Sequence, residues 1–266
     1  MFLEVCIKAS GFGACLADDM GLGKTIQAIA LLGGIREGAV RKRGLGHSPH
    51  LVVLPSGLRF NWQRELSRFY PDFYILDFAD YMESKDKEKV DVIIISYEMV
   101  RRNIEFLKKI VFDVIIFDEI QAVKNIFAGR TGAVRQLASQ FKLGLTGTPL
   151  ENHVGEYYSI MDLLVPGLLG QYSRYWQKMK GDEVGASVAR TKPFVLRRTK
   201  DLILKDLPPK LSTDVLLTMS SYQSQLYSSV LQQVRTQIKE AYEQKGEPQA
   251  RLIALTALLR LRQICL

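Results

Sequence analysis

The stretch Ala17-Asp-Asp-Met-Gly-Leu-Gly-Lys-Thr25 stands between a short apolar run, Ala14 to Ala17, and a run of helical composition, Ile26 to Leu32. A glycine-rich turn between a strand and a helix can hold a phosphate group. Its glycines let backbone amides converge on an anion at the positive end of the helix dipole. The sequence therefore predicts a phosphate-binding turn after the first strand of an α/β domain.

In the generic phosphate-binding loop, a lysine supplies a mobile cation and the next residue supplies a hydroxyl for Mg²⁺. Lys24 and Thr25 fit these two roles, and the amides of Gly21, Gly23 and Lys24 are expected to face the phosphate. The generic motif has an earlier glycine where this chain has Asp18. The alternative is a Gly-Lys-Thr surface turn that occurs by chance, and the strand and helix around the turn argue against it.

A second signal is the apolar run from Asp113 to Phe117, which ends in the adjacent carboxylates of Asp118 and Glu119. Such a run is typical of a buried parallel strand, whose carboxyl end lies at the edge of the sheet where α/β proteins bind ligands. Beside a phosphate-binding loop, Asp118 suits Mg²⁺ binding and Glu119 suits activation of the attacking water. Alternatively, the two acids are solvated at the strand end or cap the next helix.

The composition indicates a folded protein, because 47% of the 266 residues are apolar and the chain is long enough for a large core. No apolar run approaches the roughly 18 to 20 residues that span a bilayer. The amino terminus has neither a basic leader nor a small-residue cleavage site. We therefore expect an intracellular protein with no membrane partner.

The net charge and the positions of the cysteines indicate which classes of partner and metal site to expect. The three cysteines and three histidines are scattered without metal-ligand spacing, so no zinc site or disulfide framework is expected. The 36 Lys and Arg residues exceed the 28 Asp and Glu residues, which gives a formal charge of +8. This excess favours a polyanionic partner, nucleic acid before membrane, although solvated basic faces are common.

From residue 50 to 148, short apolar runs alternate with helix-like stretches. The expected strands are 50–55, 73–78, 91–96, 113–118 and 141–146, and the expected helices lie near 57–69, 97–110 and 128–139. This alternation implies right-handed crossovers and a parallel sheet that is covered on both faces. The predicted fold class is α/β, with a doubly wound parallel sheet.

After about residue 150 the strand pattern stops and the composition turns helical. Apolar residues between Tyr222 and Tyr242 recur at four-residue spacing, which predicts one long amphipathic helix. Gly246 and Pro248 interrupt it, and another apolar helix is expected from Leu252 to Leu266.

We divide the chain into a nucleotide-binding lobe, residues 1–165, and a helical insertion with terminal helices, residues 166–266. Pro208-Pro209 is the stiff connector expected before the terminal helices. Because the last helix has no cap, we expect the sequence to continue in a longer parent protein.

Taken in order, these motifs resemble those of the Swi/Snf-type DNA translocases of helicase superfamily two. The resemblance covers about residues 11–266, and Asp18 is the usual residue at its position in that family's first motif. Gln121 stands where His is commoner, which hints at a prokaryotic member of the family. The matching segments are Gly13–Gln27 (motif I), Leu54–Ser56 with Asn61, Trp62 and Glu65 (motif Ia), Ile95–Glu98, Asp118–Gln121 with Lys124 and Asn125 (motif II), Leu145–Asn152 (motif III) and Pro193–Lys200.

The resemblance implies a P-loop NTPase (RecA-like) lobe with a carboxyl-terminal helical subregion. This lobe would be the N-terminal half of a DNA-dependent ATPase that uses ATP and Mg²⁺ to move along double-stranded DNA. A prokaryotic member would be cytoplasmic and nucleoid-associated.

The resemblance also implies a role for each matching residue. The nucleotide would be bound by Asp19, Met20, Gly21, Leu22, Gly23, Lys24 and Thr25. The metal ligands would be Thr25 and Asp118, and the catalytic residues Lys24, Asp118, the water-activating Glu119, and Gln121. Gln121 would contact either the γ-phosphate side or motif III.

Further residues would connect ATP to DNA. The nucleotide state would be relayed by Thr146, Gly147 and Thr148. One DNA strand would run past Pro55, Ser56, Arg59, Ser96 and Tyr97, whose hydroxyls and backbone amides can hold phosphates without reading bases.

Some of these residues are also compatible with purely structural roles. The threonines are also compatible with turn chemistry before a proline, and Asn61-Trp62 with helix packing. Arg197 and Arg198 suit either a DNA or partner contact or a structural salt bridge.

Two family features lie outside the matched motifs. The family has an upstream glutamine that reads adenine, and ten residues precede Gly11 here. It also has a second RecA-like lobe that supplies an arginine finger, which is worth roughly 10³ to 10⁵ in turnover in NTPases. We expect the polypeptide by itself to bind nucleotide weakly and to hydrolyse it slowly.

Two other functional classes are compatible with a phosphate-binding loop. A P-loop small-molecule kinase or transferase would need an acceptor pocket, and it leaves the Thr-Gly-Thr-Pro turn unexplained. A non-catalytic module that binds nucleic acid or protein would bind its partner equally well after Lys24→Ala.

Overall fold

The structure, a computed structural model, describes residues 2–9, 13–39, 48–147, 154–179, 189–203, 213 and 215–265. The chain divides into two compact units, Met1–Leu207 and Pro208–Leu266. Thr148 and the connector Pro208-Pro209 lie outside the described residues.

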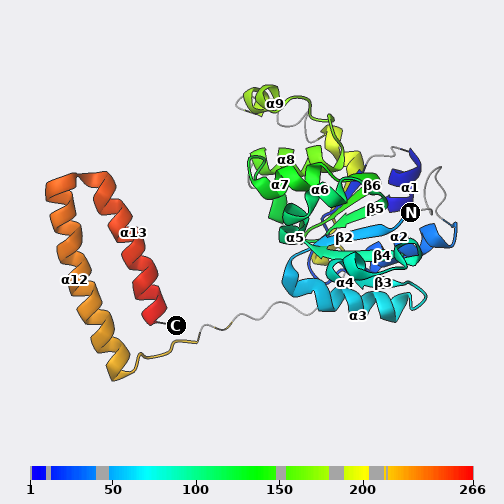
Figure 1. The fold of residues 1–266 in the computed structure, drawn as a ribbon. Helices are drawn as coiled ribbons and strands as arrows, with labels where there is room; N and C mark the ends of the chain where they lie inside the picture. Colours follow the sequence, from blue (N-terminus) through cyan, green and yellow to red (C-terminus); the bar gives the residue numbers. More distant parts are fainter. Residues whose placement is uncertain are drawn as a thin grey trace. The chain divides into compact units, whose positions relative to one another are not determined.

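The first unit is built on a seven-stranded sheet in the order β3-β4-β2-β5-β6-β1-β7 (Figure 1). Each pair of neighbouring strands in this sheet is parallel. The carboxyl ends of all strands therefore lie at one edge, as the sequence predicts. The strands are β1 (Gly13–Leu16), β2 (His50–Leu54), β3 (Ile75–Asp77), β4 (Val92–Ser96), β5 (Val111–Phe117), β6 (Ala138–Leu145) and β7 (Val195–Leu196).

Helices cover both faces of the sheet because the strand residues alternate between two apolar clusters. Val52 and Leu54 of β2 pack with α1 (Phe2–Ala9), α2 (Lys24–Arg36) and α3 (Arg59–Phe69). Their neighbours Leu51 and Val53 pack on the opposite face. The helices of that face are α4 (Phe78–Glu83), α5 (Tyr97–Arg102), α7 (Gly129–Arg135) and α8 (Val154–Leu164).

Short elements complete the first unit. They are η1 (Ser56–Leu58), η2 (Lys87–Lys89), α6 (Ile104–Leu107), η3 (Ile120–Val123), α9 (Tyr172–Met179), η4 (Lys192–Phe194) and α11 (Lys200–Ile203). The single helix expected over 97–110 is wrong, because it is interrupted at Asn103. That residue leaves helical geometry, with φ −115° and ψ 21°, and its side chain donates to the Met99 carbonyl at 2.9 Å.

Two more expectations are corrected where strand pairing prevails over local composition. The helix expected over 128–139 ends at Arg135, because Ala138 and Ser139 pair with Val111 and Phe112 and extend β6 towards the amino terminus. The strand expected over 73–78 ends at Asp77, where the backbone turns into α4.

The expectation that strands stop after residue 150 is wrong. Val195 and Leu196 form β7, which pairs in parallel with Cys15 and Leu16 of β1. A two-residue strand has no detectable periodicity, and its partner lies far away in the sequence. β7 makes β1 an interior strand, with β6 on its other side.

The second unit is a pair of helices, α12 (Ser221–Lys245) and α13 (Glu247–Ile264), which meet at Gly246. The long predicted helix is confirmed, and it begins with a capping box. The Gln223 amide donates to the Ser220 hydroxyl at 3.2 Å, and the Ser220 amide donates to the Gln223 side chain at 3.1 Å. Gln223 also donates to the Ile264 carbonyl at 3.3 Å, so the start of α12 lies beside the end of α13.

None of the helices in the described part of the chain combines the length and apolar character needed to cross a bilayer.

The first strand gives a test of the packing. A β-carbon at Gly13 would collide with the Leu164 carbonyl oxygen and come within 2.6 Å of the Lys142 carbonyl oxygen. Both obstacles are backbone atoms, so Gly13→Ala should lower the free energy of unfolding by about 1–3 kcal/mol, as overpacking typically does. Urea denaturation measures this change.

Gly132→Ala is the matched control. Gly132 lies within α7, and a β-carbon there would meet nothing within 4 Å. Alanine should therefore stabilise the chain by up to about 1 kcal/mol through helix propensity. Equal effects of the two substitutions would contradict the packing described for β1.

Candidate functional site at the carboxyl edge of the sheet

The turn after β1 has the backbone that the glycine pattern predicts. Gly21 and Gly23 have φ values of 87° and 73°, in the left-handed region where a side chain is strained. Gly23 is the N-cap of α2, so the helix begins at Lys24. The Lys24 ammonium donates to the carbonyl oxygens of Asp18 and Asp19, at 2.8 and 3.2 Å, and so lies folded against the turn.

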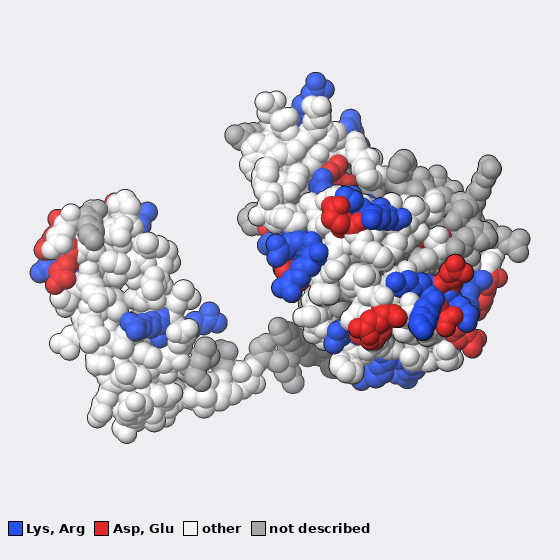
Figure 2. Space-filling view, in the orientation of Figure 1, with Lys and Arg blue, Asp and Glu red and all other residues white. Residues whose placement is uncertain are grey.

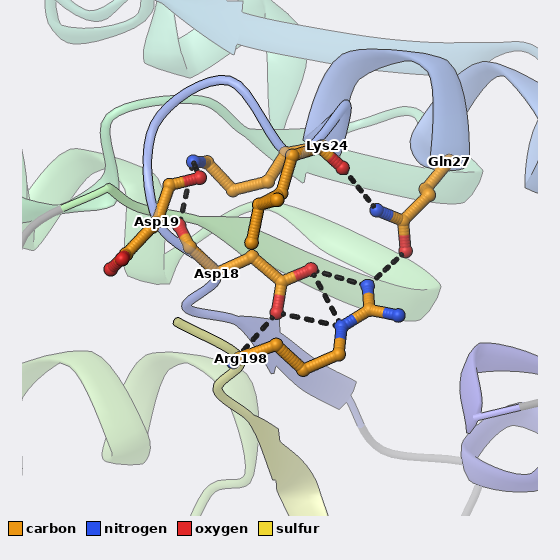
Figure 3. A network of polar contacts seen from close by, with 6 residues as sticks. Asp18, Asp19, Lys24, Gln27 and Arg198 are labelled. Atoms are coloured by element: carbon orange, nitrogen blue, oxygen red, sulfur yellow. Dashed lines mark hydrogen bonds and ion pairs between the residues drawn. The ribbon is translucent and has the colours of Figure 1, made fainter. Parts of the chain in front are cut away.

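Asp18 joins this turn to the segment after β7. Its carboxylate is fully buried and pairs with the guanidinium of Arg198 (Figure 3). Arg198 Nε lies 3.1 Å from both carboxylate oxygens, and the Arg198 backbone amide donates to Oδ1 at 3.0 Å. Of the two interpretations left open for Arg198, the structure therefore shows the salt bridge.

Asp118 lies at the end of β5, two strands away from β1 in the sheet. One carboxylate oxygen accepts a hydrogen bond of 2.8 Å from Trp62 Nε1, and the other accepts one of 3.0 Å from the Glu119 amide. Burial raises the pKa of the Asp118 carboxyl above its ordinary value, and these two hydrogen bonds oppose the rise. The carboxylate is therefore held in place but poorly solvated.

Glu119 has an unusual backbone. Among the described residues it is the one non-glycine residue with positive φ, at 48°. Its carboxylate accepts a hydrogen bond from the Gln121 side chain. The Gln121 oxygen in turn accepts one of 2.9 Å from the Thr146 hydroxyl. Gln121 thus connects the acidic motif to the turn after β6, one of the two contacts considered for it.

The turn after β6 also meets the phosphate-binding turn. A β-carbon at Gly147 would lie 2.7 Å from Met20 Cγ and 3.4 Å from Lys24 Nζ. The Thr146 amide donates to the Leu16 carbonyl at 3.1 Å. The structure therefore brings Thr146 and Gly147 beside the turn, and Thr148 lies outside the described residues.

Residues of the phosphate turn and of the acidic motif line one cavity of about 410 Å³. Lys24, Thr25, Asp118 and Glu119 all line it, together with Trp62. Sequence reasoning placed Trp62 in motif Ia and missed its bond to Asp118, because nothing in the pattern around a helix residue reveals a partner at the end of a distant strand. Asn61, Arg64 and Glu65 line the same cavity and carried no predicted ATP role.

The residues in the cavity fit a magnesium nucleotide. Gly21 and Gly23 have positive φ, which gives the turn a backbone shape that residues with side chains rarely adopt. The Lys24 ammonium, the Thr25 hydroxyl and the Asp118 carboxylate line the same cavity. In the described ranges, no group of three or more His, Cys, Asp or Glu side chains could hold a metal ion. Magnesium needs no such group, because one or two protein ligands, water and phosphate oxygens suffice.

The residues predicted to line a DNA strand follow β2 and β4, which are neighbours with Leu54 opposite Ser96. Pro55 is the N-cap of η1, which begins at Ser56, and the Ser96 hydroxyl caps α5 by accepting from the Met99 amide at 3.3 Å.

Arg59 and Tyr97 have side-chain partners within the lobe. Arg59 Nε lies 3.5 Å from Asp77 Oδ2. Tyr97 is buried, and its hydroxyl donates to the Asp118 carbonyl at 2.8 Å. The five predicted residues thus lie along the same edge as the phosphate turn, and their DNA role stays a prediction.

The raised pKa of Asp118 gives a pH test. Between the ordinary pKa of a carboxyl group and its raised value in the folded chain, the folded state holds the proton more tightly than the unfolded state does. The free energy of unfolding therefore falls as the pH rises through this window. Asp118→Asn should remove this contribution to the pH dependence of the free energy of unfolding, as measured by urea denaturation without Mg²⁺.

The useful quantity is the difference between wild type and Asp118→Asn at each pH, because the other titrating groups cancel in it. A difference that is independent of pH would contradict the environment described for Asp118.

Comparisons with known proteins agree with this geometry. The SNF2-related domain matches residues 2–266. A Bacillus subtilis protein described as the putative ATP-dependent helicase/translocase YwqA is 34% identical over 283 residues, covering 97% of this chain and 29% of the relative. A probable chromatin-remodeling complex ATPase chain of Oryza sativa subsp. japonica is 32% identical over 271 residues, covering 96% of this chain and 23% of the relative.

A solved structure is similar as well. The Sulfolobus solfataricus SWI2/SNF2 ATPase core in complex with dsDNA superposes with a TM-score of 0.69 at 35% identity, covering 99% of this chain and 56% of that one. The chain spans less than a third of the length of the two curated relatives. The ordered motifs, the parallel sheet and these matches agree, and the chain belongs to the SNF2-related family.

Proposed function

We propose that this chain is the N-terminal ATP-binding lobe of a DNA-dependent ATPase that translocates along double-stranded DNA. The observation that carries the proposal is the shared cavity, in which Lys24 and Thr25 of the phosphate turn face Asp118 and Glu119 of the acidic motif. The names of two relatives, a putative ATP-dependent helicase/translocase and a probable chromatin-remodeling complex ATPase chain, support it. A second RecA-like lobe of the parent protein would close the site.

Each residue in the cavity has a distinct task in this proposal. Lys24 would leave the carbonyl oxygens of the turn and neutralise the phosphates, which the amides of Gly21 and Gly23 also bind. Thr25 and Asp118 would hold Mg²⁺, which lowers the charge on the transferred phosphoryl group. Glu119 would accept the proton of the attacking water, and its bond to Gln121 offers a route by which Thr146 senses that change.

Duplex DNA would run along the edge where β2 and β4 end, over Pro55, Ser56, Arg59 and Ser96, while the buried Tyr97 would support this edge from within the lobe. Small hydroxyls and backbone groups there suit phosphates rather than base edges, so binding would be independent of sequence. On the face shown in Figure 2, basic and acidic side chains of the first unit lie in small mixed groups. The formal charge of +8 nevertheless favours a polyanion. A DNA partner would also place the protein inside the cell.

The proposal predicts the ATPase behaviour of the parent protein. Duplex DNA should stimulate steady-state ATP hydrolysis, and Glu119→Gln should lower the stimulated rate by about 10²-fold or more, as loss of a general base does. Glu105→Gln is the matched control, because Glu105 is exposed on α6 and pairs with Lys108. Absence of stimulation, together with full activity of Glu119→Gln, would refute the proposal.

The isolated chain should behave differently from its parent. Because the second lobe of the proposal would supply an arginine finger, residues 1–266 by themselves should hydrolyse Mg·ATP roughly 10³-fold or more slowly than the DNA-stimulated parent. Single-turnover measurements with both polypeptides check this. Equal rates would mean that the chain carries a complete site.

A further inference from the structure

The parallel ladder between β1 and β7 continues beyond both strands into the phosphate turn. The Ala17 amide donates to the Leu196 carbonyl at 2.7 Å, and the Asp19 amide donates to the Arg198 carbonyl at 3.0 Å. Farther on, the Lys200 amide donates to the Asp19 carboxylate at 3.0 Å. The first half of the turn is therefore bonded, residue by residue, to a segment that lies far away in the sequence.

The centre of this ladder is an ion pair with a fully buried acid. The Asp18 side chain is 0% exposed and that of Arg198 is 37% exposed. A buried carboxylate without its cation is strongly unfavourable, so Asp18 fixes where the guanidinium lies. The planar fork of arginine suits two carboxylate oxygens at once, and lysine lacks this geometry.

Arg198 is also connected to the second half of the turn, through Gln27 of α2. Its guanidinium donates to the Gln27 side-chain oxygen at 2.8 Å, and the Gln27 amide group donates to the Leu22 carbonyl at 3.1 Å (Figure 3). Arg198 holds Asp18, and the Asp18 carbonyl accepts a hydrogen bond from the Lys24 ammonium. Arg198 therefore also helps to set the position of this lysine when no nucleotide is bound. One guanidinium thus braces both sides of the glycine turn.

We propose that Arg198 is a positioning residue of the ATP site, which holds the phosphate turn in its binding conformation through Asp18 and Gln27. The inference rests on the proposed function, since the ligand of the turn is taken to be a magnesium nucleotide. Arg198 need not touch the nucleotide. Asp18 occupies the position of the earlier glycine of the generic loop, and its carboxylate binds the Arg198 guanidinium.

The test is the dissociation constant of Mg·ADP for the whole 266-residue chain, measured by calorimetric titration. Arg198→Ala should weaken binding by about tenfold or more, because it removes the charged partner that orders the turn. Arg198→Lys should restore part of the affinity, since it keeps the charge but not the fork. Arg174→Ala, which removes the same charge from an exposed position on α9, should change the affinity less than about twofold.

A double-mutant cycle separates positioning from a direct contact with nucleotide. If Arg198 acts through Asp18, Arg198→Ala should cost much less affinity in an Asp18→Asn background than in the wild type. The hydrogen-exchange rates of the backbone amides of residues 19–24, measured without nucleotide, should be higher in Arg198→Ala than in the wild type. A merely structural role would lower the overall stability without this local increase.

Gln27→Ala keeps the test valid if Arg198→Ala does not fold. It removes the hydrogen bonds of Gln27 to Arg198 and Leu22 and leaves the Asp18–Arg198 ion pair. It should weaken Mg·ADP binding by roughly two- to fivefold.

Lys24→Ala distinguishes failure of the positioning role from failure of the proposed function. Loss of binding in Lys24→Ala, with wild-type affinity in Arg198→Ala and Gln27→Ala, overturns the positioning role and leaves the proposed function standing. Additive effects of Asp18→Asn and Arg198→Ala overturn it as well. Wild-type binding by Lys24→Ala overturns the proposed site and the inference with it.

Discussion

The pairing of β1 between β6 and β7 is the constraint on which the site depends, because the phosphate turn starts where β1 ends. A strand at the edge of a sheet would have one free side, and its terminal turn would be held by one neighbour. Here β6 fixes one side, and β7 with Arg198 fixes the other through the buried carboxylate of Asp18. The glycines that make the turn adaptable therefore lie within a braced frame.

The site also combines order with unfavourable electrostatics. Asp118 is held by Trp62 and by the Glu119 amide, yet burial disfavours its charge when no cation is near. Glu119 has a positive φ, which is strained for a residue with a side chain. Both features cost stability in the free chain, and a bound cation would relieve the first. In the proposed site, these costs would accompany carboxylates that are already in place for a bound cation.

Sequence reasoning predicted the phosphate turn, the acidic motif at the end of β5 and the parallel sheet, because glycine patterns and apolar runs are local signals. It missed β7, the interruption at Asn103 and the early end of α7, where short segments follow distant pairing or one side-chain bond. The departure at Asp18 was visible, but its partner Arg198 was not, because 180 residues separate them. Trp62 was missed as a partner of Asp118 for the same reason: their contact depends on the packing of α3 against the sheet.

We propose that the braced turn and the acidic motif together form one nucleotide site. A crystal structure of the chain with Mg²⁺ and ADP would show whether they do. We expect the β-phosphate within the turn from Gly21 to Lys24 and the Lys24 ammonium on that phosphate. We also expect the metal beside Thr25 and Asp118, and the Asp18–Arg198 pair intact. A nucleotide bound away from this turn, or bound there with the pair broken, would contradict it.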